Sequence, residues 1–495
     1  MILIISGAYI NQEMRVEFGK IPPAFLPLGN QPLFCFQLKL IQKKFPKEGV
    51  YLTIPEDFEA NLSNKLSSVK IIKVPTEISL SESILFALNV SDSDDETVRI
   101  LNGDTLFSDL PESLDTFGVS SDYENYDWDY ASKKEALTGY FSFKSRKNLI
   151  RSLTLAKGSF SKALQIYAKQ SPEINFENIP GWLDLGHLNS YFESRAKITT
   201  ERAFNSIRVH NGALWKTGTP EKKIRAEAYW FERLPQSLKR YIPQFLGSKT
   251  EENHYWYGLE YLPFSPLNEL YVNGRQPSDF WVDIFKRCSR IIDEFSQQGV
   301  PVGFDADRYR ESLYFDKTYD RIALIEKDFE LSDLFNQVGL RDITHACLEK
   351  VKLLPKFPAI VHGDFCFSNI MFSSRGRIIK LIDPRGISGD DEVTLYGDQA
   401  YDIAKFLHSI IGMYDFIIAG KYHLKGKEIF FDEDEELSKF QDYVLSESYK
   451  GVPIRVFLPL VVLLFITMVP LHADRRDRQK AFLINAKRIY DNYMS

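Results

Sequence analysis

The segment from Val361 to Gly386, VHGDFCFSNIMFSSRGRIIKLIDPRG, restricts the fold of this chain more than any other. Two apolar runs flank a polar turn that contains Gly376, and this pattern predicts a β-hairpin. If the hairpin is symmetric about Gly376, Asn369 lies opposite Asp383. An amide oxygen then stands beside a carboxylate, and such hard oxygen ligands suit a Mg²⁺ ion that bridges nucleotide phosphates.

A second carboxylate, Asp364, lies one loop before this hairpin, in the sequence His362-Gly363-Asp364. A carboxylate at this place can accept a proton from an attacking hydroxyl or orient it. We therefore take Asp364, Asn369 and Asp383 as catalytic candidates, the last two as metal ligands. The alternative is a pair of loop turns with solvated acids, which so many matching positions on one predicted hairpin disfavour.

The pattern His362, Asp364, Asn369 and Asp383 resembles the HGDxxxxN…D motif of the aminoglycoside phosphotransferase and choline kinase family. Gly397–Lys405 resembles the helix that follows the metal loop in that family. The resemblance implies a bilobal α+β protein-kinase-like domain in which Asp364 is the base and Asn369 and Asp383 hold Mg²⁺. It also implies that ATP phosphorylates a hydroxyl of a small molecule, an amino alcohol, a polyol or a sugar.

Further residues of an ATP site are expected upstream of this motif. Lys216 ends a strand pattern and resembles the lysine that binds the nucleotide phosphates, and Glu227, in a helical pattern, resembles its ion-pair partner. Glu260 and Leu262 lie in a segment that resembles the hinge strand, whose backbone meets the adenine. The stretch 204–212, where a glycine-rich loop is expected, offers only Gly212.

Composition limits the class of protein. With 495 residues, of which 44% are hydrophobic, the chain is expected to form two or three domains with large cores. The net charge of −6 argues against a nucleic-acid partner. The four cysteines lack metal-site spacing, and no signal sequence is evident, so we expect a cytoplasmic protein with reduced thiols. The apolar stretch Val456–Leu471 contains two prolines and predicts a buried helix rather than a membrane span.

The N-terminal part alternates strand and helix patterns. Strands are predicted at Ile2–Ile5, Val50–Ile54 and Val69–Val74, with a helix over Leu33–Phe45. This alternation predicts an α/β domain with a mostly parallel, Rossmann-like sheet covered by helices on both faces. Ligands of such sheets bind beyond the carboxyl ends of the strands. The next predicted strand delivers Asp104 to that edge.

Three segments of this part resemble sugar-phosphate nucleotidyltransferases. Phe25–Leu33, FLPLGNQPL, resembles their LLPVGGKPL segment, Leu101–Asp104 their aspartate loop, and Gly181–Gly186 their WxDxGT segment. The resemblance implies that Asp104 and Asp184 bind a catalytic Mg²⁺ ion. It also implies a second nucleotide substrate, CTP or another NTP. Two carboxylates from distant positions suit a cation that also ligates phosphates.

This second resemblance is incomplete where phosphates are held. The family's glycine-rich loop corresponds to Ser6–Arg15, which contains one glycine, and Pro22-Pro23 replaces the expected lysine. Lys20 or Arg15 could supply the positive charge, although neither has the family spacing. Without such a cation, nucleotidyl transfer loses transition-state stabilisation. The domain is either a diverged transferase or one retained for binding.

We therefore predict a nucleotidyltransferase-like domain over residues 1–198 and a kinase-like domain over 199–495, with lobes 199–264 and 265–495. The first reaction is phosphorylation of a small-molecule alcohol. The second is nucleotidyl transfer to the product, which yields an activated precursor for bacterial capsule or another surface polysaccharide. Two alternatives stay open: a glycosyltransferase-like or non-catalytic N-terminal domain beside the kinase, and a scaffold protein. The sequence does not indicate the oligomeric state.

Overall fold

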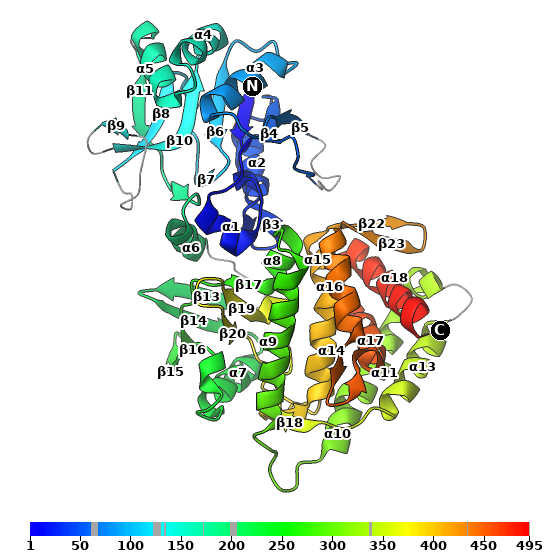
Figure 1. Cartoon of the computed structure of the whole chain (residues 1–495). Helices are drawn as coiled ribbons and strands as arrows, with labels where there is room; N and C mark the ends of the chain where they lie inside the picture. The colour runs from blue at the N-terminus through cyan, green and yellow to red at the C-terminus, as the bar shows by residue number, and fades with distance from the viewer. Residues whose placement is uncertain are drawn as a thin grey trace. The chain divides into compact units, whose positions relative to one another are not determined.

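The computed structural model of the chain describes residues 1–60, 68–121, 130–132, 135–171, 173–198, 205–335, 339–432 and 434–494. The chain forms two compact units (Figure 1). The N-terminal unit comprises Met1–Ile198 with Asn273–Arg275, and the C-terminal unit comprises Thr199–Val272 with Gln276–Ser495. Residues 199–204, which include the start of the expected glycine-rich stretch, lie outside the described part.

The N-terminal unit is built on one sheet with the strand order β11-β8-β10-β6-β1-β4-β5, and β9 pairs with β10. Its strands are β1 (Ile2–Ile5), β4 (Val50–Pro55), β5 (Val69–Val74), β6 (Val98–Asn102), β8 (Thr116–Ser120), β9 (Tyr130–Ser132), β10 (Glu135–Phe143) and β11 (Asn175–Asn178). The pairs β1–β4, β1–β6, β4–β5 and β8–β11 are parallel, whereas β10 runs antiparallel to its neighbours. The mostly parallel sheet predicted from the alternation of strands and helices is therefore present.

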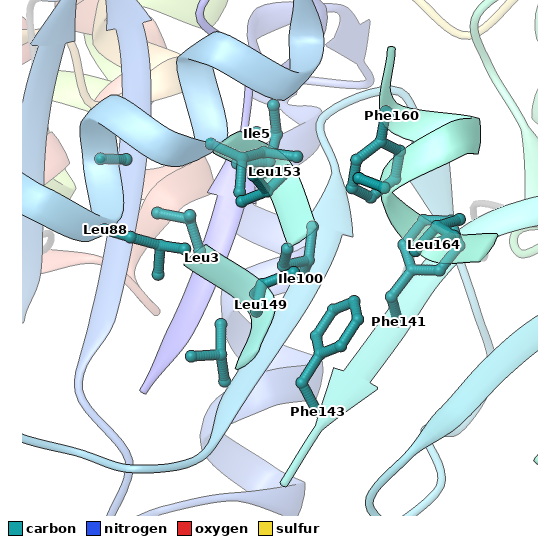
Figure 2. Close-up of a cluster of buried hydrophobic side chains, with 14 of the residues drawn as sticks. Leu3, Ile5, Leu88, Ile100, Phe141, Phe143, Leu149, Leu153, Phe160 and Leu164 are labelled. Atoms are coloured by element: carbon teal, nitrogen blue, oxygen red, sulfur yellow. The ribbon is translucent and has the colours of Figure 1, made fainter. Parts of the chain in front are cut away.

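The core of this unit lies between the sheet and a layer of helices (Figure 2). Leu3 on β1 and Phe141 on β10 meet Leu88 from α3, Leu149 from α4 and Phe160 from α5. All residues of β1 and β4 are buried, as expected of strands covered on both faces. The helices are α1 (Gln12–Phe18), α2 (Leu33–Lys44), α3 (Leu80–Val90), α4 (Arg146–Ala156), α5 (Phe160–Gln170) and α6 (Leu188–Lys197).

The C-terminal unit begins with an antiparallel sheet in the order β13-β14-β16-β15. Its strands are β13 (Asn205–His210), β14 (Ala213–Gly218), β15 (Phe245–Glu251) and β16 (His254–Glu260). Helix α7 (Glu221–Arg233) packs against β14, β15 and β16. Its apolar face, which includes the fully buried Trp230 and Phe231, explains why this amphipathic sequence docks there.

The rest of this unit is mainly helical. It contains α8 (Leu267–Asn273), α9 (Ser278–Ser296), α10 (Ala306–Arg310), the π-helical η4 (Glu311–Asp316), α11 (Lys317–Ile325), α12 (Phe329–Ser332), α13 (Leu340–Lys352), α14 (Gln399–Ile410), α15 (Tyr414–Ala419), α16 (Glu435–Ser446), α17 (Leu458–Met468) and α18 (Arg476–Tyr493). Short strands complete it: β17 (Ser265–Pro266), β18 (Pro358–Ile360), β19 (Ile370–Ser373), β20 (Ile378–Leu381), β21 (Tyr396–Asp398), β22 (Tyr422–Lys425) and β23 (Glu428–Phe431). A small sheet in the order β17-β19-β20 and the pair β18–β21 carry the loops of the candidate site.

The apolar stretch near the C-terminus is helical, and its core is α17. Ile454–His472 is long and apolar enough to cross a membrane, and 67% of it is buried inside the unit. Helices α11, α13, α14 and α18 pack against α17. This packing agrees with the predicted buried helix, because the apolar side chains of α17 contact neighbouring helices of the same unit.

Candidate functional site

The predicted hairpin forms from β19 and β20, but its register differs from the expectation by one residue. The turn spans four residues, 374–377. The peptide N–H of Ile382 donates to the carbonyl oxygen of Asn369 at 3.0 Å, so Asn369 faces Ile382 and not Asp383. The expected symmetry about Gly376 was wrong because a turn with an even number of residues is centred between two of them.

The loop before the hairpin is fixed by Asp402 of α14. The N–H groups of His362 and Gly363 donate to the two carboxylate oxygens of Asp402 at 2.8 and 2.7 Å. His362 is fully buried, and its Nε2 lies 2.9 Å from the carbonyl oxygen of Ile382. These contacts join the loop to α14 on one side and to the end of the hairpin on the other, so Asp364 is held between them.

The Asp364 carboxylate has two close partners, Lys405 and Asn369, and the Cys366 thiol lies 3.9 Å from its Oδ1. Its Oδ1 lies 2.9 Å from Lys405 Nζ, and its Oδ2 accepts a hydrogen bond from Asn369 Nδ2 at 2.9 Å. Burial acts to raise the pKa of Asp364, but the neighbouring Lys405 ammonium lowers it overall. The carboxylate is therefore ionised at neutral pH, and 38% of its side chain is exposed. An ionised and accessible carboxylate can accept a proton.

Lys216 on β14 joins the strand side of the site to the loop that contains Asp383. Its ammonium lies 2.7 Å from Glu227 Oε2 and 3.1 Å from Asp383 Oδ1. Tyr257 also donates to Glu227, at 2.7 Å. Burial opposes the charge on Lys216, but the two carboxylates raise its pKa, so it stays a cation. Asp383 has a left-handed backbone conformation, with φ of 55°. This conformation is uncommon for residues other than glycine, and where it occurs it is often at a functional site.

These groups line one cavity of about 720 Å³ in the C-terminal unit. Asp364, Asn369, Asp383, Lys216 and Glu227 all contribute to its wall. The cavity thus contains five of the seven residues that the sequence placed in the kinase site. Such a volume suits a small ligand.

The two predicted hinge residues do not line that cavity. Glu260 is the last residue of β16 and is exposed, and Leu262 follows it and is half-buried. The backbone N–H of Glu260 already donates to the carbonyl oxygen of Gln244 at 2.9 Å. Their role at the adenine stays a prediction.

Comparison with known proteins bears on this unit. Residues 213–419 match the model of the phosphotransferase enzyme family, APH. This region therefore has the kinase-like fold of that family. The match begins at β14 and ends at α15, so it contains the strand lysine, the loop and the hairpin described above. No curated protein matches the chain.

Solved structures similar to the chain include three phosphotransferases of low sequence identity. A thermostable mutant of aminoglycoside phosphotransferase APH(4)-Ia is 12% identical, with 60% of this chain and 94% of that chain covered and a TM-score of 0.40. The GDP complex of aminoglycoside 2'-phosphotransferase-IIIa is 14% identical, with coverage of 59% and 91% and a TM-score of 0.33. A choline/ethanolamine kinase family protein from Mesorhizobium loti is 8% identical, with coverage of 62% and 96% and a TM-score of 0.35.

The N-terminal unit brings together the two aspartates predicted there as metal ligands. Asp184 ends β12 (Leu183–Asp184), which pairs antiparallel with β7 (Thr105–Leu106), the strand that follows Asp104. A Cβ atom on Gly186 would lie 2.7 Å from Asp104 Oδ2 and 3.4 Å from Asp184 Oδ1, so both carboxylates border this glycine. Burial and the Asp184 charge raise the pKa of Asp104 to about 6. A close carboxylate pair of this kind can bind a divalent cation.

Polar groups around this pair are also ordered. The Asp184 carboxylate accepts hydrogen bonds from the Gly186 N–H at 3.2 Å and from the Ser190 hydroxyl, and it lies 2.9 Å from His187 Nδ1. Within the described residues no group of three or more His, Cys, Asp or Glu side chains with metal-site geometry occurs. A cation held by Asp104 and Asp184 would therefore need oxygen ligands from a substrate or water.

Neither basic residue considered for the phosphate loop is free to move without breaking contacts. Lys20 Nζ lies 2.9 Å from Asp57 Oδ2, and its ammonium stands 4.3 Å from the centre of the Tyr9 ring. Arg15 Nε donates to the carbonyl oxygen of Ile10 at 2.7 Å. Both cations therefore have partners within the N-terminal unit.

Several residues of the candidate site had no role assigned from the sequence. Lys405 and Asp402 were noticed only as parts of a helix, although their contacts hold Asp364 and its loop. Lys317 and Arg385 also line the cavity. Lys317 and Arg385 lie far from Lys405 in the chain, so only the fold could reveal that these three meet at one cavity.

Proposed function

We propose that the C-terminal unit transfers the γ-phosphate of ATP to a hydroxyl of a small molecule. One observation carries the proposal: the ionised carboxylate of Asp364, paired with Lys405, lines the same cavity as the Lys216–Glu227–Asp383 cluster. The Lys216–Glu227–Asp383 cluster suits nucleotide phosphates, and the Asp364–Lys405 pair suits an attacking hydroxyl. A phosphotransfer site needs both at the same cavity.

In this proposal Asp364 accepts the proton of the acceptor hydroxyl. The acceptor oxygen forms a bond to the γ-phosphorus, the bond from that phosphorus to the bridging oxygen breaks, and ADP leaves. Lys405 keeps Asp364 ionised and Asn369 holds its second oxygen, so the carboxylate stays oriented for the transfer. Asp402 acts through the loop and positions Asp364.

Lys216 binds the α- and β-phosphates of ATP, and Glu227 orients it. Asn369 and Asp383 are suited to hold Mg²⁺, because both offer hard oxygens at the cavity. Among the described residues, Asn369 Oδ1 accepts only a long hydrogen bond, 3.3 Å, from the Ser368 hydroxyl. The ion supplies neutralisation of phosphate charge when bound. Glu260 and Leu262 meet the adenine in this proposal.

For the N-terminal unit we propose binding of a second nucleotide, CTP or another NTP, with Mg²⁺ held by Asp104 and Asp184. The approach of these two carboxylates, 80 positions apart in the sequence, supports it. If the unit is catalytic, it transfers a nucleotidyl group to the phosphorylated alcohol and yields an activated precursor. A role in the cytoplasmic supply of capsule or other surface polysaccharide rests on the resemblance of the sequence alone.

Calorimetric titration of the full chain with the non-hydrolysable analogue AMP-PNP and Mg²⁺ tests the nucleotide part of the kinase proposal. We expect saturable binding that the Asp383→Asn substitution weakens by about tenfold or more, which corresponds to about 1.4 kcal/mol. Asp104→Asn serves as a matched control, since it removes a carboxylate from the other unit. Equal affinity of the wild type and Asp383→Asn would remove Asp383 from the nucleotide site, and absence of binding to the wild type would refute the kinase proposal.

A further inference from the structure

The cavity of the C-terminal unit has basic residues that the proposed phosphotransfer does not use. Besides Lys216 and Lys405, its wall contains Lys223 on α7, Lys317 and Arg321 on α11, and Arg385 just beyond the metal loop. Lys317 and Arg321 are four positions apart on one helix and therefore lie on the same face. These cations come from three segments that the fold brings to one cavity.

None of these four residues has an ion-pair partner among the described residues. Arg321 donates only to the carbonyl oxygen of Thr467, at 3.3 Å. Arg385 reaches the Tyr401 hydroxyl at 3.5 Å, and its guanidinium stands 5.9 Å from the centre of that ring. Paired cations occur close by in sequence: Arg308 binds Asp390 and lies 3.6 Å from Asp316.

Most carboxylates of the cavity wall already have a basic partner. Asp316 and Asp390 face Arg308, and Asp364 faces Lys405. Two others, Asp320 and Asp391, are exposed to solvent. In water such exposed charges interact weakly with their surroundings. The four cations Lys223, Lys317, Arg321 and Arg385 thus outnumber Asp320 and Asp391, the two carboxylates left to balance them.

The excess of positive charge affects Lys317. It is half-buried, and burial together with Arg385, Lys405, Arg321 and Lys223 pushes its pKa well below the ordinary value. A like-charged environment of this kind costs free energy in the free protein. An anion bound among these groups would remove that cost, because it would favour the charged form of the lysine.

We propose that Lys317, Arg321 and Arg385 form a subsite for an anionic group of the phosphate acceptor. This inference rests on the proposed kinase function and names its substrate class: an alcohol that already carries a phosphate or a carboxylate. ATP is not the expected occupant, because in the proposal above its phosphates are served by Lys216 and by the Mg²⁺ ion that Asn369 and Asp383 would hold. The guanidinium of Arg385 and the ammonium of Lys405, the partner of Asp364, stand 5.9 and 6.0 Å from the centre of the same Tyr401 ring, which places the subsite on the side of the attacking hydroxyl.

The same cavity also has a neutral group that can form hydrogen bonds, the imidazole of His408. His408 on α14 lines the cavity and is fully buried, and neither of its ring nitrogens has a hydrogen-bond partner among the described residues. Burial and the nearby Lys405 lower its pKa far below neutrality. An uncharged imidazole with free donor and acceptor sites suits the uncharged hydroxyl part of such a substrate.

The test uses the full chain saturated with Mg²⁺ and AMP-PNP, so that the nucleotide site, including the γ-position, is occupied. Inorganic sulfate and acetate are the probes for a phosphate-like and a carboxylate group, and glycerol is the neutral probe. Binding is followed by the rise in melting temperature at constant ionic strength. We expect saturable stabilisation by one of the two anions and none by glycerol. The anion that stabilises identifies the class of acceptor group.

Lys317→Gln should weaken anion binding by about tenfold or more and leave AMP-PNP affinity within about twofold of the wild type. Arg385→Gln provides a second variant with the same expected effect. Lys327→Gln is the matched control, because Lys327 is exposed and does not line the cavity.

The outcomes separate the two proposals. If AMP-PNP binds but neither anion does, or if the anion binds both glutamine variants as tightly as the control, the anionic subsite is overturned and the kinase proposal stands. A loss of AMP-PNP affinity in Lys317→Gln equal to the loss of anion affinity would assign the cations to the nucleotide and also overturn it. If the wild type does not bind AMP-PNP, the kinase function itself fails, and this inference fails with it.

Discussion

Asp402 offers a sensitive test of how the fold holds the loop that contains His362, Gly363 and Asp364. Its two carboxylate oxygens accept the N–H groups of His362 and Gly363 at 2.8 and 2.7 Å, and only 2% of the residue is exposed. The Asp402→Asn substitution keeps the size of the side chain. Its amide oxygen can accept one N–H, but its NH₂ group cannot accept the other. One buried N–H then lacks an acceptor, at a cost of about 1–3 kcal/mol in the free energy of unfolding.

The pH dependence of this cost has a definite sign. Burial raises the pKa of Asp402 to about 7, although the two N–H donors favour the charged form. An aspartate in the unfolded chain titrates near ~3.9, so the folded state binds a proton in this interval that the unfolded state releases. The stabilising contribution of that proton is present below the unfolded pKa and is lost as the pH rises through about 7.

Because each pH unit in this interval corresponds to about 1.4 kcal/mol, the wild type should lose about 2–3 kcal/mol between about pH 5 and pH 8 through this group alone. The amide side chain of the Asp402→Asn variant does not titrate, so the destabilisation caused by the substitution should shrink as the pH rises. Urea unfolding of both proteins at several pH values, followed by tryptophan fluorescence, measures the difference. A destabilisation that is constant or grows with pH would refute the reasoning, and unchanged turnover of the variant would refute the positioning role.

Three further changes test other parts of the account. Asp364→Asn should lower kcat by about 10²-fold or more, with Mg²⁺–AMP-PNP affinity nearly unchanged, and kinase assays with calorimetry check this. Lys216→Met removes the ammonium that lies between the Glu227 and Asp383 carboxylates, so we expect loss of nucleotide binding and a lower melting temperature. Gly186→Ala places a Cβ atom 2.7 Å from Asp104 Oδ2; cation binding by the N-terminal unit, measured by calorimetry, should weaken while phosphotransfer by the other unit stays unchanged.

Local patterns predicted much of the secondary structure. The strand over Val69–Val74 and the helix that begins at Leu33 have the expected limits or nearly so, because apolar periodicity and burial agree there. The presence of a β-hairpin beyond Asn369 also followed from two apolar runs around a polar turn. Its register did not, because apolar runs do not fix the number of residues in the turn, and one residue changes which side chains face each other.

Local sequence patterns could not predict the contacts between distant segments. The resemblance to a kinase family gave roles to Asp364 and Lys216. It placed Asp402 and Lys405 only on a helix, without indicating that they hold Asp364 and its loop. Their importance depends on α14 lying against the loop, and this arrangement follows from packing of the whole unit. Lys317 shows the same limit, since its basic surroundings come from segments that only the tertiary fold assembles.

The central claim is that the C-terminal unit phosphorylates a hydroxyl of a small molecule with Asp364 as the base. The most direct measurement is ³¹P NMR of the full chain with Mg²⁺, ATP and a pool of alcohols that includes amino alcohols, polyols, sugars, hydroxy acids and phosphorylated sugars. The account predicts a new phosphomonoester signal and ADP, both absent with the Asp364→Asn variant. Equal production of the phosphomonoester by the variant, or no acceptor-dependent ADP and phosphomonoester with the wild type, would contradict it.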